Sequence, residues 1–569
     1  MKLPEKALTW ALILLLFALV IATIILGSVP PVDRDALTHH LFVPKLWLKH
    51  GGIYEIPEIP FSYYPMNLDL LYTIPLYFGN DIIPKYIHYL FALLTGLLLY
   101  QYLHKRLGKA YGLLGALFFL SVPIIVKLSI TVYVDLGVVF FTTASLLLLL
   151  HWAEQHFAWR WLVLAGLCCG LAAGAKYNGI ISIIVLTLLT PLLYQQSATK
   201  QTRSNAKALL CGIVFTAAAL ASFSPWMIRN SIWTGNPIYP LHNASIQKLH
   251  STGPDQQRAD HVGIASSLKQ ISRNGGNIFI GQTILYNESW WQILLLPIRF
   301  FYEGQDDNPR YFDGKLTPFL LILPFFGFLF RPSDVQQRRE QNFLLWFSLL
   351  YFFFTFFQEA LRIRYIAPIV PPLAILSIYG LRGLITTLSI RITSATHRKT
   401  AGIIVAIVIP FTMLWYNGQY LINQFTIVQP IPHVQGKVSR DDYITAFRQE
   451  YPAIRFANTV VPKDAKVLCL FLGNRGYYMD FHPVFEQPYA SDGILARFLA
   501  DKNQRHTIID EMRQRQINHI LLRSDLTAQW LDQLSDQDRQ RIAPLFAHSE
   551  QPLWNGQGHI LLTVAQQKQ

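Results

Sequence analysis

Long hydrophobic runs alternate with polar segments along most of the chain. They lie near residues 7–28, 86–103, 110–126, 136–152, 161–175, 179–194, 208–227, 316–330, 343–358, 365–381 and 401–422. The first is uncharged from Ala7 to Val32, about 26 residues, which at 1.5 Å per residue is enough to cross a bilayer core of roughly 30 Å. The pattern predicts a multi-span α-helical membrane protein with about eleven spans.

The runs at 161–175 and 179–194 are predicted to be two helices. One helix of about 34 residues would be roughly 51 Å long and would place Lys176 in mid-membrane, at a cost of about 3 kcal/mol. A turn within Gly174-Ala-Lys-Tyr-Asn-Gly179 avoids both problems.

The distribution of Lys and Arg predicts the orientation. Loops on the amino-terminal side hold most of the basic residues. The short loops opposite hold four: Lys127, Lys176, Arg362 and Arg364. The positive-inside rule then places the amino terminus in the cytoplasm, and an odd number of spans places the carboxyl terminus outside. Three long segments, 29–85, 228–315 and 423–569, are expected on the outer face.

Composition supports this interpretation. The chain is 52% hydrophobic and 14% charged, too apolar for ordinary globular cores to bury. The net charge of +14 falls mostly in loops between spans, so it indicates membrane insertion and argues against a nucleic-acid partner. Cys168, Cys169 and Cys211 lie in hydrophobic runs and Cys469 lies alone, so no disulfide framework is expected.

The chain is predicted to have two parts. Residues 1–422, with their outer loops, form a transmembrane module, and residues 423–569 form a small extracytoplasmic α/β domain. In that domain 466–473 and 518–523 have the character of buried strands, and 494–516 between them has helical spacing.

Two aspartates, Asp33 and Asp35, follow the first span. The segment 35–48 has the pattern of an amphipathic helix lying in the membrane interface and bent at Pro44, and an aspartate at its start could cap free N–H groups. Asp135 opens the fourth span on the same predicted boundary. Carboxylates at a membrane edge can face water while touching a lipid headgroup, so all three are candidate catalytic residues.

Five short motifs then identify a family resemblance. They are Asp35-Ala-Leu-Thr-His-His-Leu41, Tyr133-Val-Asp135, Ala175-Lys-Tyr-Asn-Gly179, Trp233-Thr-Gly-Asn-Pro-Ile-Tyr-Pro240 and Arg364-Tyr-Ile-Ala-Pro-Ile-Val-Pro371. In order and sidedness they resemble bacterial GT-C glycosyltransferases, those grouped with protein O-mannosyltransferases and the lipid A aminoarabinose transferase. The resemblance covers the layout of residues 7–420, and the family often carries a soluble domain after its spans.

The resemblance implies a sugar donor linked to polyprenyl phosphate and an extracytoplasmic acceptor, which is a lipid, a glycan or a protein. An acidic residue in the first outer loop of the family works at the acceptor, and Asp35 best matches that position. Related enzymes often have adjacent acidic residues where this chain has Asp33-Arg-Asp35, so Asp33 stays open as the alternative. A carboxylate can take the proton of a hydroxyl that attacks the anomeric carbon in an inverting displacement while the lipid phosphate leaves.

The leaving phosphate requires cations on the outer side. The candidates are Lys176, Arg364, Arg362 and Arg229. Arg364 is favoured because arginine can grip phosphate through two parallel hydrogen bonds. Tyr63 and Tyr64 could stack on the sugar or flank the prenyl chain.

Other candidates follow from single residues. His39 lies four residues after Asp35, so the pair could hold a divalent metal, although no cofactor is certain. Glu288 is a candidate acceptor residue. No nucleotide-phosphate loop, dinucleotide fingerprint or His-Glu-x-x-His motif stands out, which argues against a nucleotide-sugar donor.

Two other function classes stay open. A transporter or flippase for lipid-linked sugars would carry ionisable residues deep within spans and repeated halves, whereas the charges here lie at span edges. A non-catalytic membrane protein would use residues 423–569 as an outer binding domain. The favoured location is the bacterial cytoplasmic membrane, with the active face outside.

Overall fold

The structure is a computed structural model and describes residues 5–201, 203–241, 282–283, 286–330, 332, 334–356, 362–391, 395–488, 493–502, 506–547 and 552–564. These residues form two compact units. The helical unit comprises residues 5–28, 63–241 and 282–434. The mixed unit comprises residues 29–62 and 435–564.

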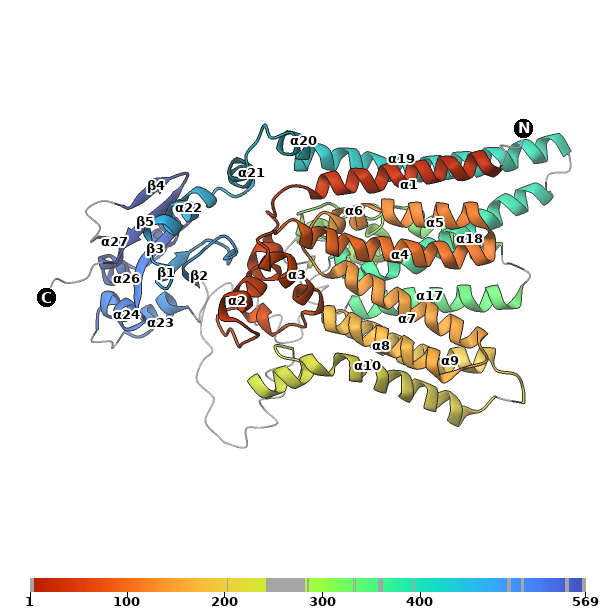
Figure 1. Ribbon diagram of the computed structural model, residues 1–569, viewed down its shortest axis with the longest axis horizontal. Coiled ribbons are helices and arrows are strands. Elements are labelled where there is room, and N and C mark those ends of the chain that lie inside the picture. The colour runs from red at the N-terminus through yellow and green to blue at the C-terminus, as the bar shows by residue number, and fades with distance from the viewer. Residues whose placement is uncertain are drawn as a thin grey trace. The chain divides into compact units, whose positions relative to one another are not determined.

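Each of the eleven hydrophobic runs contributes a helix to the helical unit (Figure 1). These helices are α1 (Glu5–Gly27), α4 (Ile83–Leu107), α5 (Lys109–Ser121) with α6 (Pro123–Ser129), α7 (Asp135–Glu154), α8 (Trp159–Ala175), α9 (Gly179–Ser197), α10 (Asn205–Thr234), α16 (Phe319–Leu329), α17 (Val335–Thr355), α18 (Val370–Arg391) and α19 (Ala395–Val428). The shorter elements are α3 (Asn67–Tyr77), α14 (Trp290–Leu294), α15 (Leu296–Arg299), η3 (Pro309–Tyr311), η4 (Ile363–Ile369) and α20 (Pro430–Val434). The predicted multi-span helical architecture is confirmed.

Among the described residues, seven helices are long and apolar enough to cross a membrane, and α5 with α6 makes an eighth across a bend of 67°. The bend lies at Pro123, which cannot donate a backbone hydrogen bond and so interrupts the helix. The helices α8 and α16 are shorter, at 17 and 11 residues. The predicted number of spans and their orientation stay predictions.

Small residues allow close packing of α8 on α10. Gly166 and Gly170 are spaced four residues apart on α8, and a Cβ atom added at Gly170 would lie 2.1 Å from the carbonyl oxygen of Ala219 on α10. Such spacing lets two membrane helices approach at the backbone. In the α8–α9 pair, α8 ends at Ala175 and α9 starts at Gly179, so a short turn separates two helices, as the sequence predicted.

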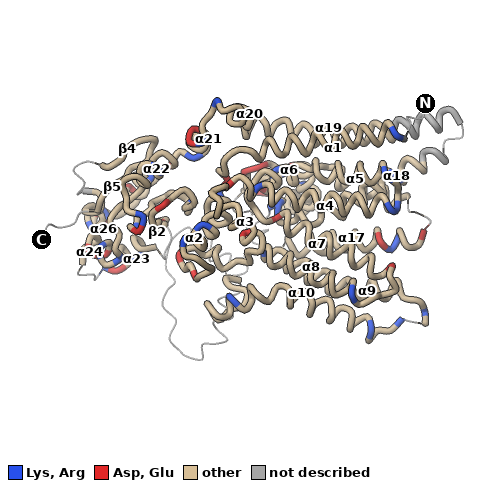
Figure 2. The backbone as a smooth tube through the Cα atoms, viewed as in Figure 1, with Lys and Arg blue, Asp and Glu red and all other residues tan. Residues whose placement is uncertain are grey.

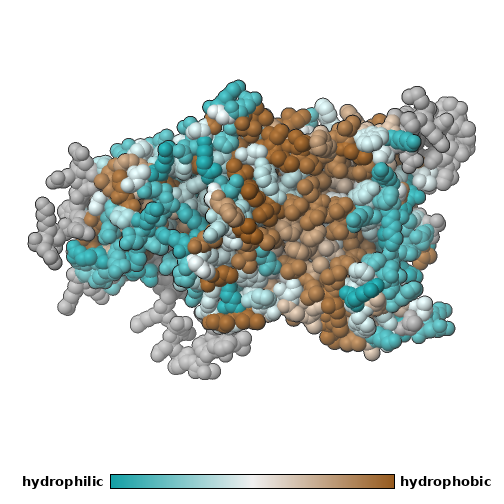
Figure 3. All heavy atoms as spheres, in the orientation of Figure 1, coloured by the Kyte–Doolittle hydropathy of each residue, from teal (hydrophilic) through white to brown (hydrophobic). Residues whose placement is uncertain are grey.

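Charge is confined to the ends of the helices. Figure 2 shows few Lys, Arg, Asp or Glu residues along the middle of the helical unit, and Figure 3 shows hydrophobic residues covering its flank. Water is absent from a bilayer core and an unsolvated charge there is costly, so this distribution is what membrane insertion requires.

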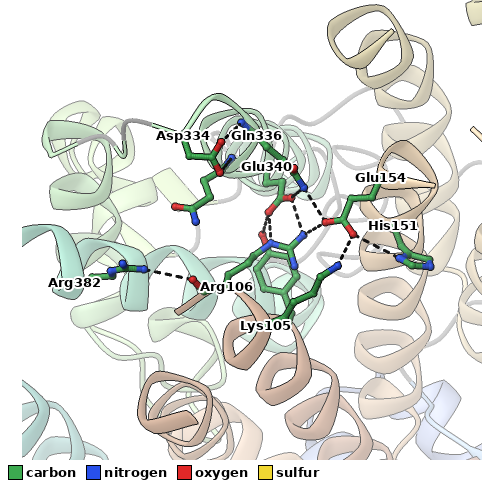
Figure 4. A network of polar contacts seen from close by, with 10 residues as sticks. Lys105, Arg106, His151, Glu154, Asp334, Gln336, Glu340 and Arg382 are labelled. Atoms are coloured by element: carbon green, nitrogen blue, oxygen red, sulfur yellow. Dashed lines mark hydrogen bonds and ion pairs between the residues drawn. The ribbon is translucent and has the colours of Figure 1, made fainter. Parts of the chain in front are cut away.

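A buried ionic network joins α4, α7 and α17 at one end of the bundle (Figure 4). Arg106 donates to both carboxylate oxygens of Glu340, at 2.5 and 2.7 Å, and also to Glu154. Tyr102 adds a hydrogen bond of 2.6 Å to Glu340, while Lys105 pairs with Glu154 from a more exposed position. The network neutralises the buried Glu340 carboxylate near the start of α17.

The mixed unit contains a five-stranded sheet in the order β2-β1-β3-β5-β4. Its strands are β1 (Lys466–Leu470), β2 (His482–Glu486), β3 (Ile517–Arg523), β4 (Trp554–Gly556) and β5 (His559–Thr563). The pairs β1–β2 and β1–β3 are parallel, and β5 pairs antiparallel with β3 and β4. The predicted small α/β domain is therefore confirmed.

Helices cover both faces of this sheet. Side chains alternate along a strand, so Leu468 and Leu470 of β1 enter one core while Val467 and Cys469 enter the other. The helices are α21 (Arg440–Phe447), α22 (Tyr451–Val460), α23 (Ile494–Ala500), α24 (Ile508–Gln514), α25 (Ser524–Asp532), α26 (Asp536–Ile542) and α27 (Pro544–Ala547). The segment 494–516, predicted from its spacing to be helical, contains two short helices, α23 and α24, because a capping box at Thr507 and Asp510 starts a second one.

Removing Glu340 should destabilise the helical unit. The change Glu340→Ala leaves the Arg106 guanidinium buried without its main partner, which costs about 3–5 kcal/mol. Thermal unfolding of the detergent-solubilised protein measures this effect. Lys105→Ala is the control, because its exposed ion pair contributes at most about 1 kcal/mol. Equal melting temperatures for the two variants would contradict a structural role for the network.

Candidate functional site

The start of α7 is fixed by a buried histidine of α4. His88 Nε2 accepts a hydrogen bond of 2.9 Å from the Leu136 N–H, while Nδ1 lies 2.9 Å from the Leu128 carbonyl and 3.1 Å from that of Thr131. Carbonyl oxygens only accept, so Nδ1 carries the proton and the ring is neutral. His88 thereby satisfies a first-turn N–H that has no partner within the helix, directly beside Asp135.

Asp135 and Lys176 form a buried ion pair. The Lys176 ammonium lies 2.6 Å from Asp135 Oδ1, with side-chain exposures of 16% for the lysine and 5% for the aspartate. The other carboxylate oxygen, Oδ2, is buried with no hydrogen-bond partner among the described residues. One lysine hydrogen therefore holds the carboxylate, and the remaining hydrogens are available to a further acceptor.

Arg364 brings a second cation to the same end of the bundle. It comes from η4, is buried to 8% exposure, and its guanidinium carbon lies 5.1 Å from the centre of the Tyr133 ring and 5.4 Å from that of Tyr365. The Lys176 ammonium lies 5.2 Å from the same Tyr365 ring. We call Asp135, Lys176 and Arg364 the cation cluster. The three residues are far apart in sequence, and their predicted common location is found.

Arg362 is held by the loop 304–315. Its guanidinium lies 3.3 Å from Asp313 Oδ2, and the next residue, Ile363, donates its N–H to the Phe312 carbonyl at 2.7 Å. The segment that carries Arg364 is thus hydrogen-bonded to the loop 304–315. The role of Arg362 in binding the sugar donor stays a prediction, and Asp313 already neutralises part of its charge.

Arg229 anchors the tyrosine segment. It donates to the carbonyls of Tyr63 at 2.6 Å and Tyr64 at 3.2 Å, and its guanidinium lies between the rings of Trp226 and Trp233, at 4.5 and 4.8 Å. The Arg229 side chain therefore holds the backbone at Tyr63 and Tyr64 in place. The roles predicted for Arg229, Tyr63 and Tyr64 in donor binding stay predictions.

Glu288 forms a two-pronged ion pair. Its carboxylate oxygens accept from Arg299 at 2.8 and 3.0 Å, and Arg299 also donates to Glu303 at 2.7 Å. Glu288 is 3% exposed, so its charge is directed at Arg299. Its predicted part in acceptor binding stays a prediction and would operate through that arginine.

In the mixed unit, Asp33 and Asp35 precede a π-helix, η1 (Ala36–His40), whose Leu41 N–H bonds to the Ala36 carbonyl at 2.9 Å. Such wide turns are rare and are frequent at functional sites. Both aspartates are half-buried, and the Asp35 side chain makes no capping hydrogen bond. Helix capping, the simplest structural role for Asp35, is thus not used.

The predicted bend at Pro44 is misplaced. The break falls at Leu41, between η1 and α2 (Phe42–His50), because Pro44 has no N–H to continue the ladder to the His40 carbonyl. Gly51, with φ of 86°, ends α2. The apolar residues Leu37, Leu41 and Trp47 are buried, so this face is covered in the folded chain.

The loop after β1 holds the aspartate segment in place. The Tyr478 hydroxyl donates to the Pro31 carbonyl at 2.8 Å, and the Tyr477 N–H donates to the Leu37 carbonyl at 3.1 Å. Lys45 of α2 donates to the carbonyls of Tyr477 and Met479, both at 2.9 Å. These bonds lie on both sides of Asp33 and Asp35 and join that segment to the loop after β1 within one compact unit.

Tyr443 is the neighbour of Asp33 within this unit. Burial and the negative charge of Asp33 raise the pKa of its hydroxyl well above the usual range. The tyrosine therefore stays protonated at physiological pH.

The structure offers few metal ligands. Within the described ranges, no group of three or more His, Cys, Asp or Glu is placed to hold a metal ion. The His39 ring stacks on Phe61 with centres 4.6 Å apart. A metal ion at Asp35 and His39 stays a prediction, and these two residues would be its ligands.

Comparisons with known proteins found a match to one protein family and a similarity of fold to solved structures. A model of the dolichyl-phosphate-mannose-protein mannosyltransferase family matches residues 78–228. The crystal structure of ArnT from Cupriavidus metallidurans in the apo state is similar with a TM-score of 0.58 and 11% identity, covering 99% of both chains. No curated protein sequence matches significantly.

Two ligand-bearing structures have the same architecture. ArnT bound to undecaprenyl phosphate is similar with a TM-score of 0.52 and 11% identity, over 98% of this chain and 99% of that one. An Archaeoglobus fulgidus oligosaccharyltransferase tethered to an acceptor peptide gives 0.52 and 13%, over 91% and 70%. This chain has the GT-C fold. The family match and the fold together support a membrane glycosyltransferase.

Within this GT-C fold, sequence reasoning missed several supporting residues. His88 carried a weak signal, a histidine within a hydrophobic run. Tyr133 lies in the Tyr-Val-Asp motif and Tyr365 beside Arg364, so their place near the cations was open to inference. Tyr443 and Tyr478 gave no signal, because only folding brings them to the first loop.

The tyrosine tether can be tested directly. Tyr478→Phe removes one hydrogen bond, worth about 1 kcal/mol of stability, but frees the chain just before Asp33. We expect about a tenfold loss of turnover, equivalent to ~1.4 kcal/mol of barrier. The matched control is Tyr451→Phe, whose hydroxyl binds Asp441 at 2.7 Å and does not contact the aspartate segment. Equal activity in both variants would contradict the positioning role.

Proposed function

We propose that this chain is an inverting glycosyltransferase that moves a sugar from a polyprenyl-phosphate donor to an acceptor at the extracytoplasmic face of a bacterial cytoplasmic membrane. The observation that carries the proposal is the cation cluster. Lys176 and Arg364 supply two positive charges and Asp135 one negative charge, in a nearly water-free site at the end of a span. The donor class agrees with the undecaprenyl phosphate named for one structure of the same fold.

The location of the cation cluster suits a lipid phosphate. Asp135 begins α7 and Glu154 ends it, so the cluster lies about 30 Å from the ionic network that Glu154 joins. That distance matches a bilayer core, and a prenyl chain in the bilayer would bring its phosphate to this boundary. The positive-inside rule assigns the network end to the cytoplasm, so the cation cluster faces outward.

The chemistry follows from charge development. When the bond between the anomeric carbon and the phosphate oxygen breaks, negative charge grows on the phosphate, and preplaced cations stabilise it. Asp135 holds the Lys176 ammonium in position through their 2.6 Å contact, and Arg364 can bind two phosphate oxygens. Asp35 is the proposed base that takes the acceptor proton, and Asp33 is the alternative.

The choice of base is testable with paired variants. Asp35→Asn should lower transfer by about 100- to 10,000-fold while leaving membrane insertion and melting unchanged. Asp33→Asn should retain most activity. The assay follows a labelled sugar from polyprenyl phosphate to an envelope extract. Full activity of Asp35→Asn, or transport of the donor across vesicles without product, contradicts the proposal.

The donor site is tested by a neighbouring pair of arginines. Arg364→Lys loses the bidentate grip, so the donor KM should rise about tenfold, equivalent to ~1.4 kcal/mol. Arg362→Lys should change it little, because its half-exposed pair with Asp313 contributes at most about 1 kcal/mol. A larger effect at Arg362 would reverse the two assignments.

A further inference from the structure

The helical unit contains a cavity that the proposed chemistry does not use. It has a volume of about 470 Å³, within the usual range for small-ligand sites. Three elements form its wall: α14, the end of α15, and the loop 303–315. The lining residues that the argument uses are Trp291, Arg299, Tyr302, Gln305, Arg310 and Tyr311.

The lining of this cavity suits a sugar ring. Trp291, Tyr302 and Tyr311 offer flat aromatic faces, on which the C–H face of a pyranose can stack. Gln305 and Arg310 offer amide and guanidinium groups that can bind hydroxyls. Aromatic rings and hydrogen-bonding side chains in one lining can fix both the position and the orientation of such a ligand.

The cavity lining carries charges of both signs. Arg299 is already bound by Glu288 and Glu303, and the other cations of the lining, Arg310 and Lys315, lie over the rings of Tyr311 and Tyr416, at 5.6 and 5.3 Å. The loop 303–315 also carries Asp306, Asp307 and Asp313. The surroundings therefore have no positive excess that would select an anion, and the neutral hydroxyls of a sugar are the ligand groups that this lining fits.

The cavity is coupled to the cation cluster by the backbone. Gln305 and Gly314 form a hydrogen bond of 2.9 Å across the loop, and Phe312 accepts from Ile363 at 2.7 Å. Arg364 is the next residue after Ile363. A ligand in the cavity would thus sit beside the segment that holds the proposed donor cation, on the same end of the bundle.

The cavity also adjoins a surface suited to the membrane interface. On α14, Trp290 and Leu294 are 77% and 69% exposed, and Ile298 on α15 is 48% exposed. Exposed tryptophan beside exposed aliphatic residues is typical of the headgroup level of a bilayer. A sugar bound here would therefore come from a molecule that is itself in the membrane.

We propose that this cavity binds a sugar unit of a lipid-anchored glycan acceptor. The inference rests on the proposed function, because only a transferase has an acceptor. Glu288 is a positioning residue in this account: its two bonds to Arg299 hold that guanidinium in the cavity wall. The proposal selects a glycolipid over a protein as the acceptor class.

Adjacent tryptophans allow a matched binding test. Trp291 lines the cavity, whereas Trp290 is its exposed neighbour and does not. The full chain in phosphatidylcholine nanodiscs is titrated with soluble mono- and disaccharides, each with and without a phosphate group, and binding is read by saturation-transfer NMR. Trp291→Ala and Arg310→Ala should each weaken binding about tenfold, a difference of ~1.4 kcal/mol, while Trp290→Ala should not change it.

The remaining outcomes decide against the proposal. These are no saccharide binding by the wild-type chain, an equal loss in Trp290→Ala, and complete competition by inorganic phosphate, which would indicate an anion site. A lowered melting temperature identifies a misfolded variant. If Trp291→Ala is misfolded, Arg310→Ala tests the proposal in its place. Binding does not require turnover, so a failed transfer assay overturns the proposed function while this measurement still reports on the cavity.

Discussion

The hydrocarbon core cannot solvate charge, and the arrangement of this chain follows from that constraint. Along α7 the first and last residues, Asp135 and Glu154, are both acidic, and each enters a different polar cluster. Between them the helix is uncharged over about 30 Å. One cluster ties helices together through Arg106 and Glu340. The other, which we propose as the site of the donor phosphate, brings Lys176 and Arg364 together beside Asp135.

The proposed chemistry also requires that the segment with Asp33 and Asp35 keeps one conformation. Asp33 and Asp35 directly precede the π-helix η1, a wide turn of a rare kind. The loop after β1 bonds to this segment through Tyr477 and Tyr478. The sheet domain is thereby explained as a support for the aspartate segment, in addition to any binding role of its own.

The sequence was sufficient for the helices and for part of the site. Apolar length is a strong signal, so each hydrophobic run located a helix, and predicted sidedness brought Asp135, Lys176 and Arg364 to one boundary. The break at Leu41 was missed because the effect of Pro44 is felt one turn upstream. Two contacts could not be foreseen, those of Glu288 with Arg299 and of Tyr478 with Pro31. Which side chains pair across a loop, or across 447 residues of sequence, depends on how the chain folds.

The central claim is that a sugar leaves a polyprenyl phosphate for an envelope acceptor. The most direct measurement is mass spectrometry of envelope lipids and glycolipids from cells with and without this chain. The account predicts that one glycolipid class loses the mass of a single sugar while the corresponding polyprenyl-phosphate sugar accumulates. Unchanged glycolipids with no accumulation of the donor would contradict it.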